Sequence, residues 1–124
     1  SGKNIVSIDD SMVRGNNSMR EKELLYDVCS VKEVFHINYT PQIGILGNDE
    51  TPRGCLFGVD MPPDDNFIAR NRTTEEISDI MGMQVIYISV KGMLDVYREL
   101  GIPEEHLCTY CIGGKHPHKK KEIP

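Results

Sequence analysis

The sequence contains no apolar run of the length that a membrane-spanning helix requires, and its mean hydropathy is −0.37. It also has no surplus of basic residues, because 14 Lys and Arg stand against 19 Asp and Glu. The resulting net charge of −5 argues against general nucleic-acid binding. No signal peptide is evident at the polar start, Ser1-Gly2-Lys3, so we expect a cytoplasmic protein whose partners include neither a membrane nor a nucleic acid.

Internal repeats and low-complexity tracts are absent from the sequence, and no Ser–His–Asp set of the kind used in nucleophilic catalysis is evident. With 124 residues the chain amounts to one domain or less, and 39% of hydrophobic residues can form a modest core. We expect residues 3–115 to form the folded unit. Residues 116–124, which include three consecutive lysines, are expected to form a flexible tail.

Four cysteines, Cys29, Cys55, Cys108 and Cys111, raise the question of disulfides or metal binding. An even number permits disulfides, but nothing in the sequence suggests secretion, and cytosolic cysteines at metal spacing favour ligation. Cys108 and Cys111 form one C-x-x-C motif. Taken alone, this motif is compatible with zinc, redox chemistry, an iron–sulfur cluster or coincidence.

The stretch with the most chemical information lies near the amino end of the sequence. Apolar residues 5–8 predict a buried strand, and two carboxylates, Asp9 and Asp10, follow at its carboxyl end. A short polar loop containing Gly15 then leads into a helix expected over residues 18–29. In open α/β sheets ligands bind just beyond the carboxyl ends of the strands, which is where this loop lies.

The chemistry of this loop favours a phosphate group. Backbone N–H groups at the start of a helix lack partners and attract anions, and Gly15 lets the backbone approach such an anion closely. The loop residues that can add side-chain donors are Ser11, Asn16, Asn17 and Ser18. Asp9 and Asp10 would repel a phosphate but suit a sugar diol or Mg²⁺. The alternative interpretation is an Asp-Ser turn that caps the next helix.

A second strand is expected over residues 33–39, and a strand–helix–strand unit of this length implies a right-handed crossover and a parallel sheet. His36 lies in the middle of this strand, where a packed, hydrogen-bonded histidine is favoured over a ligand. Residues 40–54 are rich in Pro and Gly and predict a loop with a short strand at residues 43–46.

Three more elements are expected before the cysteine motif. Asp64 can cap a short helix over residues 64–71, and Thr73-x-x-Glu76 is a capping box that opens a helix ending at Gly82. A strand over residues 85–88 and a helix ended by Gly101 and Pro103 follow. The apolar side chains expected on the core faces of the three longer helices are Leu24, Leu25, Val28, Ile77, Ile80, Met81, Met93, Leu94, Val96, Tyr97 and Leu100.

Three sequence blocks together resemble the glutamine phosphoribosyl pyrophosphate (PRPP) amidotransferases, a family of type I phosphoribosyltransferases. The first block, Ile-Asp-Asp-Ser-Met-Val-Arg-Gly and its continuation, spans residues 5–18. The second comprises residues 54–62, 66–71 and 75–77, and the third comprises residues 89–94 and 107–114. The resemblance covers residues 4–115, and the blocks occur in the family's order.

The resemblance implies a type I phosphoribosyltransferase-like α/β fold, a parallel sheet with flanking helices, of which this chain holds only the C-terminal part. In the family an upstream glutaminase domain supplies ammonia, which displaces pyrophosphate from PRPP to give 5-phosphoribosylamine, the first committed intermediate of purine synthesis. The pyrophosphate loop also lies upstream, so the fragment alone is expected to be inactive. The resemblance further implies feedback inhibition by purine nucleotides and a homo-oligomeric full-length enzyme.

The resemblance assigns roles to residues that match the family's motif. The residues implied to bind PRPP are Asp9, Asp10, Ser11, Met12, Val13, Arg14, Gly15, Asn16, Asn17 and Ser18. Within this set, Asp9 and Asp10 match the acidic pair that holds the ribose hydroxyls and Mg²⁺. Asn16 and Asn17 stand where the family often has threonine, and Asn can still donate to phosphate.

Some members of the family carry a [4Fe–4S] cluster on four cysteines, and Cys55, Cys108 and Cys111 match three of these. The fourth lies upstream in the family, so the full-length protein could hold a cluster that this chain alone cannot complete. Two other interpretations are three reduced thiols, or zinc bound by the three cysteines together with His116 or His118. Cys29 is expected to pack at a helix end instead.

Two further functions compete with the amidotransferase interpretation. One is a stand-alone module that binds PRPP or a nucleotide without catalysis. The other is a salvage phosphoribosyltransferase, which the lack of a base-recognition hood and of a pyrophosphate loop disfavours. The loop at residues 40–54 is also longer than in many bacterial members of the family.

Overall fold

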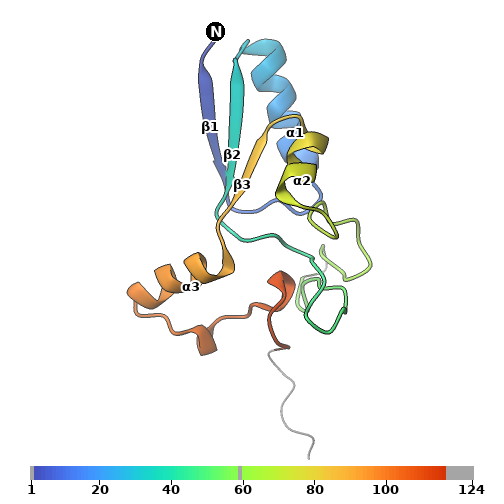
Figure 1. Ribbon diagram of the computed structural model, residues 1–124, viewed down its shortest axis with the longest axis vertical. Helices are drawn as coiled ribbons and strands as arrows, with labels where there is room; N and C mark the ends of the chain where they lie inside the picture. Colours follow the sequence, from blue (N-terminus) through green and yellow to red (C-terminus); the bar gives the residue numbers. More distant parts are fainter. Residues whose placement is uncertain (1, 59, 117–124) are drawn as a thin grey trace, which may run out of the picture.

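The centre of the molecule is a three-stranded sheet, seen in a computed structural model that describes residues 2–58 and 60–116. Its strands are β1 (Asn4–Asp9), β2 (Glu33–Asn38) and β3 (Gln84–Tyr87), in the order β1-β2-β3 (Figure 1). Both neighbouring pairs are parallel, which confirms the prediction from the strand–helix–strand pattern. The tail expected at residues 116–124 lies outside the described residues, apart from His116.

The helices connect these strands and extend beyond them. α1 (Asn16–Glu23) continues into one π turn, η1 (Leu24–Val28), and links β1 to β2. α2 (Thr74–Met81) precedes β3 and α3 (Val90–Glu99) follows it, before two 3-10 turns, η2 (Glu104–His106) and η3 (Tyr110–Ile112). Within the described part of the chain, no helix combines the length and the apolarity needed to cross a membrane.

The main core lies between one face of the sheet and the helices α1 and α2, which share that face (Figure 1). Its buried residues are Met12, Val34, Ile68, Ala69, Ile77, Met81, Met83 and Val85. A smaller cluster of Ile43, Phe67 and Ile112 joins the long loop after β2 to η3. Because strand side chains alternate between faces, residues 34, 36 and 38 of β2 all point into the covered side.

The capping box that was predicted for α2 is present. The Thr73 hydroxyl accepts a hydrogen bond from the Glu76 N–H at 3.2 Å, and the Glu76 carboxylate accepts one from the Thr73 N–H at 2.8 Å. The helix ends at Gly82 in the left-handed conformation, with φ of 65°. Local sequence therefore defines both ends of α2, as expected.

Five of the apolar side chains predicted for helix core faces are instead exposed: Leu24, Val28, Ile80, Val96 and Leu100. In η1 the π hydrogen-bond spacing shifts side chains away from the regular α-helical faces, so the predicted stripe is broken. Helix α3 lies beyond the lower end of the sheet and packs on η2, so none of its residues is fully buried (Figure 1).

The short helix predicted over residues 64–71 is wrong, because this segment forms only turns. The Arg70 guanidinium binds carbonyl groups that a helix would use internally, those of Pro63 at 2.6 Å and Asp65 at 3.2 Å. Asn71 then adopts a left-handed φ of 55°, which stops any helical continuation. Side-chain binding of the backbone thus replaces helical hydrogen bonds here.

Two predictions around β2 also need correction. His36 is packed, at 1% exposure, but neither ring nitrogen has a hydrogen-bond partner, so the predicted hydrogen-bonded histidine is wrong. Its neighbours on the covered face are mainly apolar, including Val34 and Val85. The strand predicted at residues 43–46 is reduced to a single antiparallel bridge between Leu46 and Pro52, which fits the irregular loop predicted around it.

Candidate phosphate-binding site

A cavity of about 330 Å³ lies beyond the carboxyl end of β1. It is lined by Asp9, Asp10, Ser11, Met12, Val13, Arg14, Gly15, Asn16, Asn17 and Ser18. This set coincides with the residues that the sequence motif singles out. The fold therefore gathers the acidic pair and the polar loop around one hollow, at the edge of the sheet where ligands of α/β proteins bind.

The start of α1 forms one wall of this cavity. The helix begins at Asn16, two residues before the predicted start at Ser18, and its first backbone bond runs from the Met19 N–H to the Gly15 carbonyl at 2.9 Å. The N–H groups of Asn16, Asn17 and Ser18 precede that bond and so have no acceptor within the helix. The first turn carries no acidic side chain, which leaves its positive dipole end to attract an anion.

Gly15 directs the chain from the loop into α1. Its φ of 84° is left-handed, a conformation that costs a residue with a side chain about 1–2 kcal/mol. A Cβ atom at this position would also lie 3.0 Å from the sulfur of Met81, which is buried in the core. Glycine therefore satisfies the backbone and lets the start of α1 pack closely on the core.

The acidic pair is anchored through its backbone. The carbonyl of Asp9 accepts from the Tyr39 N–H at 2.9 Å, and that of Asp10 accepts from the Thr40 N–H at 3.1 Å. The Asp10 N–H donates to the Asp9 carboxylate at 2.8 Å, while the Ser11 hydroxyl lies 3.4 Å from the Asp10 carboxylate. Both carboxylates thus retain free oxygens at the cavity, since Asp10 is exposed and Asp9 is half-buried.

The donor chemistry of the pair fits a hard cation such as Mg²⁺. Carboxylate oxygens are preferred ligands, and Mg²⁺ is commonly held by one or two carboxylates, with waters and substrate phosphates completing the shell. Across residues 2–58 and 60–116 there is no group of three or more His, Cys, Asp or Glu side chains arranged to hold a metal. A cation here would therefore depend on the phosphorylated ligand for further oxygens.

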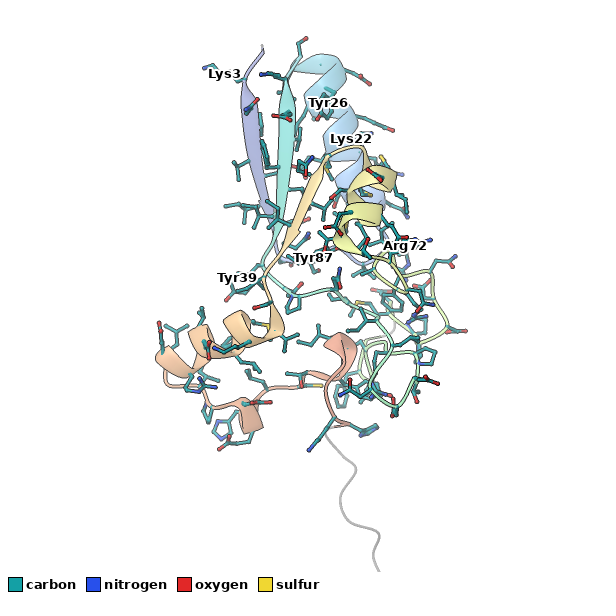
Figure 2. The ribbon with its side chains drawn as sticks, in the orientation of Figure 1. Lys3, Lys22, Tyr26, Tyr39, Arg72 and Tyr87 are labelled. Atoms are coloured by element: carbon teal, nitrogen blue, oxygen red, sulfur yellow. The ribbon has the colours of Figure 1, made fainter. Side chains whose placement is uncertain are left out.

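Not every lining residue presents its side chain to the cavity. Met12 is only 2% exposed, and its sulfur lies 3.9 Å from the hydroxyl of Tyr87, at the lower end of β3 (Figure 2). Ser18 is also buried, and the Val13 carbonyl accepts from the Ile68 N–H at 2.8 Å. These residues fix the loop to the core and border the cavity with backbone atoms. The Tyr87 hydroxyl that contacts Met12 is itself largely buried, and this burial raises its pKa to about 12.

Arg14 connects the loop to a distant segment of the chain. Its guanidinium pairs with the carboxylate of Asp65 and donates to the carbonyl of Asp60. The hydrogen bond from Arg14, followed by that from the Asn66 N–H, lowers the pKa of Asp65. The predicted contribution of the Arg14 side chain to phosphate binding thus competes with a structural ion pair.

Arg70, which lies in the second sequence block and has no role predicted from the sequence, organises several loop segments. Its guanidinium stacks on Phe67, 4.6 Å from the ring centroid, and donates to the carbonyls of Gly44 at 2.6 Å and Arg53 at 2.5 Å. With its bonds to Pro63 and Asp65, it joins the loop after β2 to the turn that carries Asp65. A single arginine inside a turn-rich stretch gives no sequence signal for such multiple carbonyl binding.

Cys55 and Cys108 lie close enough to Cys111 to affect its thiol electrostatically. Burial raises the pKa of the Cys111 thiol, and the neighbouring Cys55 and Cys108 raise it further. The sulfur of Cys55 accepts a hydrogen bond from the Gly58 N–H at 3.1 Å. All four cysteines are free, and Cys29 is exposed, so its predicted packing at a helix end is wrong.

The zinc alternative gains no support from the described geometry. His116 packs its ring edge-on against Tyr110, with centroids 5.4 Å apart, and His118 lies outside the described residues. No metal-holding group of three cysteines and histidines was found in the part of the chain that the structure describes. Within the described residues, the three thiols are therefore not arranged as a metal site.

Comparison with known proteins shows what this arrangement is similar to. No protein-family model matches the chain. The amidophosphoribosyltransferases of Archaeoglobus fulgidus and Methanocaldococcus jannaschii are each 33% identical to it over 117 residues, or 94% of this chain. A solved glutamine PRPP amidotransferase from B. subtilis, complexed with ADP and GMP, superimposes on the whole chain with a TM-score of 0.74 and 27% identity.

The chain is homologous to one segment of the amidophosphoribosyltransferases. It spans 23% and 22% of the lengths of the two archaeal relatives and 26% of the solved B. subtilis chain. Both the resemblance read from the three sequence blocks and the predicted type I phosphoribosyltransferase-like fold are thereby confirmed. The cavity at Asp9–Ser18 lies within the part of the chain that matches these relatives.

Proposed function

We propose that this segment binds PRPP as part of an amidophosphoribosyltransferase, the enzyme that makes 5-phosphoribosylamine from PRPP and ammonia derived from glutamine. The observation that carries the proposal is the pairing of two chemistries in one cavity. The unpaired N–H groups at the start of α1 suit a terminal phosphate, and the carboxylates of Asp9 and Asp10 suit the ribose hydroxyls.

In this proposal the N–H groups of Asn16, Asn17 and Ser18 hold the 5′-phosphate, with Gly15 allowing its close approach. Asp9 and Asp10 accept hydrogen bonds from the ribose hydroxyls and supply oxygens for Mg²⁺. When bound, Mg²⁺ would neutralise charge on the departing pyrophosphate. The residues on this chain orient the sugar so that its anomeric carbon is open to ammonia on one side and loses pyrophosphate on the other.

The protein needs no nucleophilic side chain for this displacement. Breaking the bond between the anomeric carbon and pyrophosphate places positive charge on the sugar ring, and the nearby carboxylates favour that charge. Ammonia, delivered by the glutaminase part of the enzyme, then forms the new carbon–nitrogen bond as pyrophosphate leaves, and the resulting ammonium group loses one proton to solvent to give the amine. Both the glutaminase and the pyrophosphate loop would come from the three quarters of the enzyme that this segment does not include.

We further propose that Cys55, Cys108 and Cys111 contribute three ligands to a [4Fe–4S] cluster in the complete enzyme, in the cytoplasm. The match of these three cysteines to the cluster ligands of the family motif supports this, and a fourth thiolate must come from outside this segment. Among the described residues the three thiols are not yet arranged to hold a metal, so the rest of the enzyme would have to complete the arrangement. Complete protein purified without oxygen should be brown and contain labile sulfide. A colourless protein with stoichiometric zinc would rule out the cluster.

A binding module without catalysis is the second candidate, because the B. subtilis relative was solved in complex with the nucleotides ADP and GMP. A nucleoside monophosphate offers the same ribose and 5′-phosphate as PRPP. The same cavity is then also the site proposed for purine nucleotides that inhibit the enzyme by competition. A module of this kind would bind both ligands but would form no phosphoribosylamine.

The test uses the complete enzyme with Asp10→Asn, and Asp27→Asn as a matched control on an exposed site at the far end of η1. Asp10→Asn should reduce ammonia-dependent phosphoribosylamine formation at limiting PRPP and Mg²⁺ by at least about tenfold, as loss of one charged ligand predicts. Asp27→Asn should leave it unchanged. Equal rates for wild type and Asp10→Asn would refute the role of the acidic pair.

A further inference from the structure

A second cavity, of about 360 Å³, shares no lining residue with the cavity at Asp9–Ser18. Its walls come from the loop after β2 and from the segment that begins at η3, which lie side by side below the sheet (Figure 1) and are joined by a hydrogen bond from the Gly44 N–H to the Cys111 carbonyl at 2.8 Å. A hollow of this size can hold a small molecule. Its lining residues are Asp49, Thr51, Arg53, Tyr110, Lys115 and His116.

Arg53 places a buried charge at this cavity. It is only 7% exposed, although burying a guanidinium is costly unless its charge and its N–H groups are matched. The guanidinium rests on the backbone of Gly47, where an added Cβ would collide with it, and on the ring of Tyr110, 4.5 Å from the centroid. Packing contacts therefore fix the position of the guanidinium without using its N–H groups.

The hydrogen bonds of Arg53 use only part of its donors. A guanidinium has five N–H groups. Nη2 pairs with the Asp49 carboxylate at 3.1 Å and Nη1 lies 3.4 Å from the Tyr110 hydroxyl, while the buried Nε has no partner among the described residues. In Arg70, by contrast, all three nitrogens donate to backbone carbonyls. Arg70 thus serves the backbone, whereas Arg53 keeps donors for a further acceptor.

The charges of the lining favour an anion. Arg53 and Lys115 are two cations beside one carboxylate, that of Asp49. Asp49 offsets Arg53 only in part, because its side chain is 59% exposed and the oxygen that pairs with Arg53 also accepts from the Thr51 N–H at 3.1 Å. That hydrogen bond is the main cause that lowers the pKa of Asp49. Hydroxyl groups and an imidazole ring elsewhere in the lining can add neutral donors.

We propose that this cavity binds the phosphate or carboxylate group of a small molecule, with the Arg53 guanidinium and the Lys115 ammonium as its two charged donors. A guanidinium fork matches the oxygens of both groups. The ligand is small, because Glu104 and Glu105 line an adjoining cavity that shares Lys115 and would repel an extended polyanion. The site is separate from the cavity proposed for PRPP, so the inference does not rest on the proposed function.

The two cations come from the segments that also carry the cysteines. Arg53 lies two residues before Cys55, and Lys115 lies four residues after Cys111. A bound oxyanion that contacts both cations would therefore hold the loop after β2 against the segment that follows η3.

The test follows acylation of lysines in the complete protein by a succinimidyl ester, read by mass spectrometry of the modified peptides. The probes are inorganic phosphate and acetate, each compared with chloride at the same ionic strength. A probe at about ten times its dissociation constant should slow acylation of Lys115 about tenfold. Lys32, an exposed lysine between η1 and β2, is the matched control and should react at an unchanged rate. The probe that protects Lys115 at the lower concentration identifies the group that the site takes.

Three variants assign the protection to the cavity. Asp49→Asn removes the charge beside Arg53 but keeps an oxygen for the Thr51 N–H, so half-protection of Lys115 should need about two- to fivefold less probe. Arg53→Gln should abolish the protection, whereas Arg98→Gln, an exposed arginine on α3, should leave it unchanged. If Arg53→Gln does not fold, wild type and Asp49→Asn still decide the question.

Three results would overturn the proposal: no slowing beyond that in chloride, equal slowing of Lys32, or unchanged half-protection in Asp49→Asn. Because the measurement reads the Lys115 peptide alone, phosphate bound at Asp9–Ser18 does not affect it. Failure of this site and failure of the proposed PRPP site are therefore distinguishable.

Discussion

Replacement of Gly15 by alanine should destabilise the protein by about 2–5 kcal/mol, for two separable reasons. The φ of 84° costs a residue with a Cβ about 1–2 kcal/mol. The new Cβ would lie 3.0 Å from the Met81 sulfur, and Met81 is almost fully buried. Forcing a side chain to move within a packed core costs about 1–3 kcal/mol more.

Two other glycines calibrate this estimate, because they share its backbone conformation but not its surroundings. Gly101 has φ of 79° with no atom within 4 Å of an added Cβ, so Gly101→Ala should cost only the backbone term of about 1–2 kcal/mol. Gly44 has φ of 76°, and an added Cβ would lie 2.1 Å from the Phe67 ring. Gly44→Ala should therefore cost the most of the three.

The assay is urea unfolding of the three variants and the wild type, followed by far-ultraviolet circular dichroism. The expected order of destabilisation is Gly101→Ala, then Gly15→Ala, then Gly44→Ala. If Gly15→Ala costs no more than Gly101→Ala, then the start of α1 does not pack on Met81, and the account of why glycine is needed at the phosphate loop is wrong.

His36→Leu should stabilise the protein by about 1–3 kcal/mol in the same unfolding assay, because it removes two buried ring nitrogens that lack partners; a loss of stability would contradict the unpartnered histidine. Asp65→Asn should lower stability at pH 7, because the ion pair with Arg14 is lost. Since Arg14 lowers the pKa of Asp65 in the folded state, the stabilisation is present above the unfolded pKa and is lost as pH falls below about 4. The unfolding curves of Asp65→Asn and wild type should thus converge on acidification, and a constant difference down to pH 2 would argue against the pair.

The elements that the sequence predicted correctly are those with local signals. The capping box at Thr73 and Glu76 and the glycine at 82 define α2 without help from the rest of the chain. The apolar run before Asp9 and the polar loop after it likewise define β1 and the start of α1 to within two residues. The cavity residues were predictable because they are contiguous, so a single motif contains them all.

The errors come from interactions that link distant residues or depend on missing neighbours. Arg70 binds carbonyls up to 26 residues away, and this long-range binding replaces the helix predicted over residues 64–71. The apolar residues on one side of α3 predicted that this helix packs into a core. Among the described residues no side chain of α3 is fully buried, and Leu100 at its end is 68% exposed. For His36, the position in an apolar strand predicted burial correctly. The lack of a hydrogen-bond partner for its ring depends on which residues pack around it, and these come from other strands.

Direct binding of PRPP tests the central claim, that Asp9 to Ser18 form a site for a ribose with a 5′-phosphate. Isothermal titration of the complete protein should show Mg²⁺-dependent PRPP binding that ribose 5-phosphate displaces. A double Asp9→Asn, Asp10→Asn variant should bind PRPP at least about tenfold more weakly, about 1.4 kcal/mol, while Asp27→Asn binds as wild type does. Unchanged PRPP affinity in the double variant, or binding that ribose 5-phosphate fails to displace, would contradict the account.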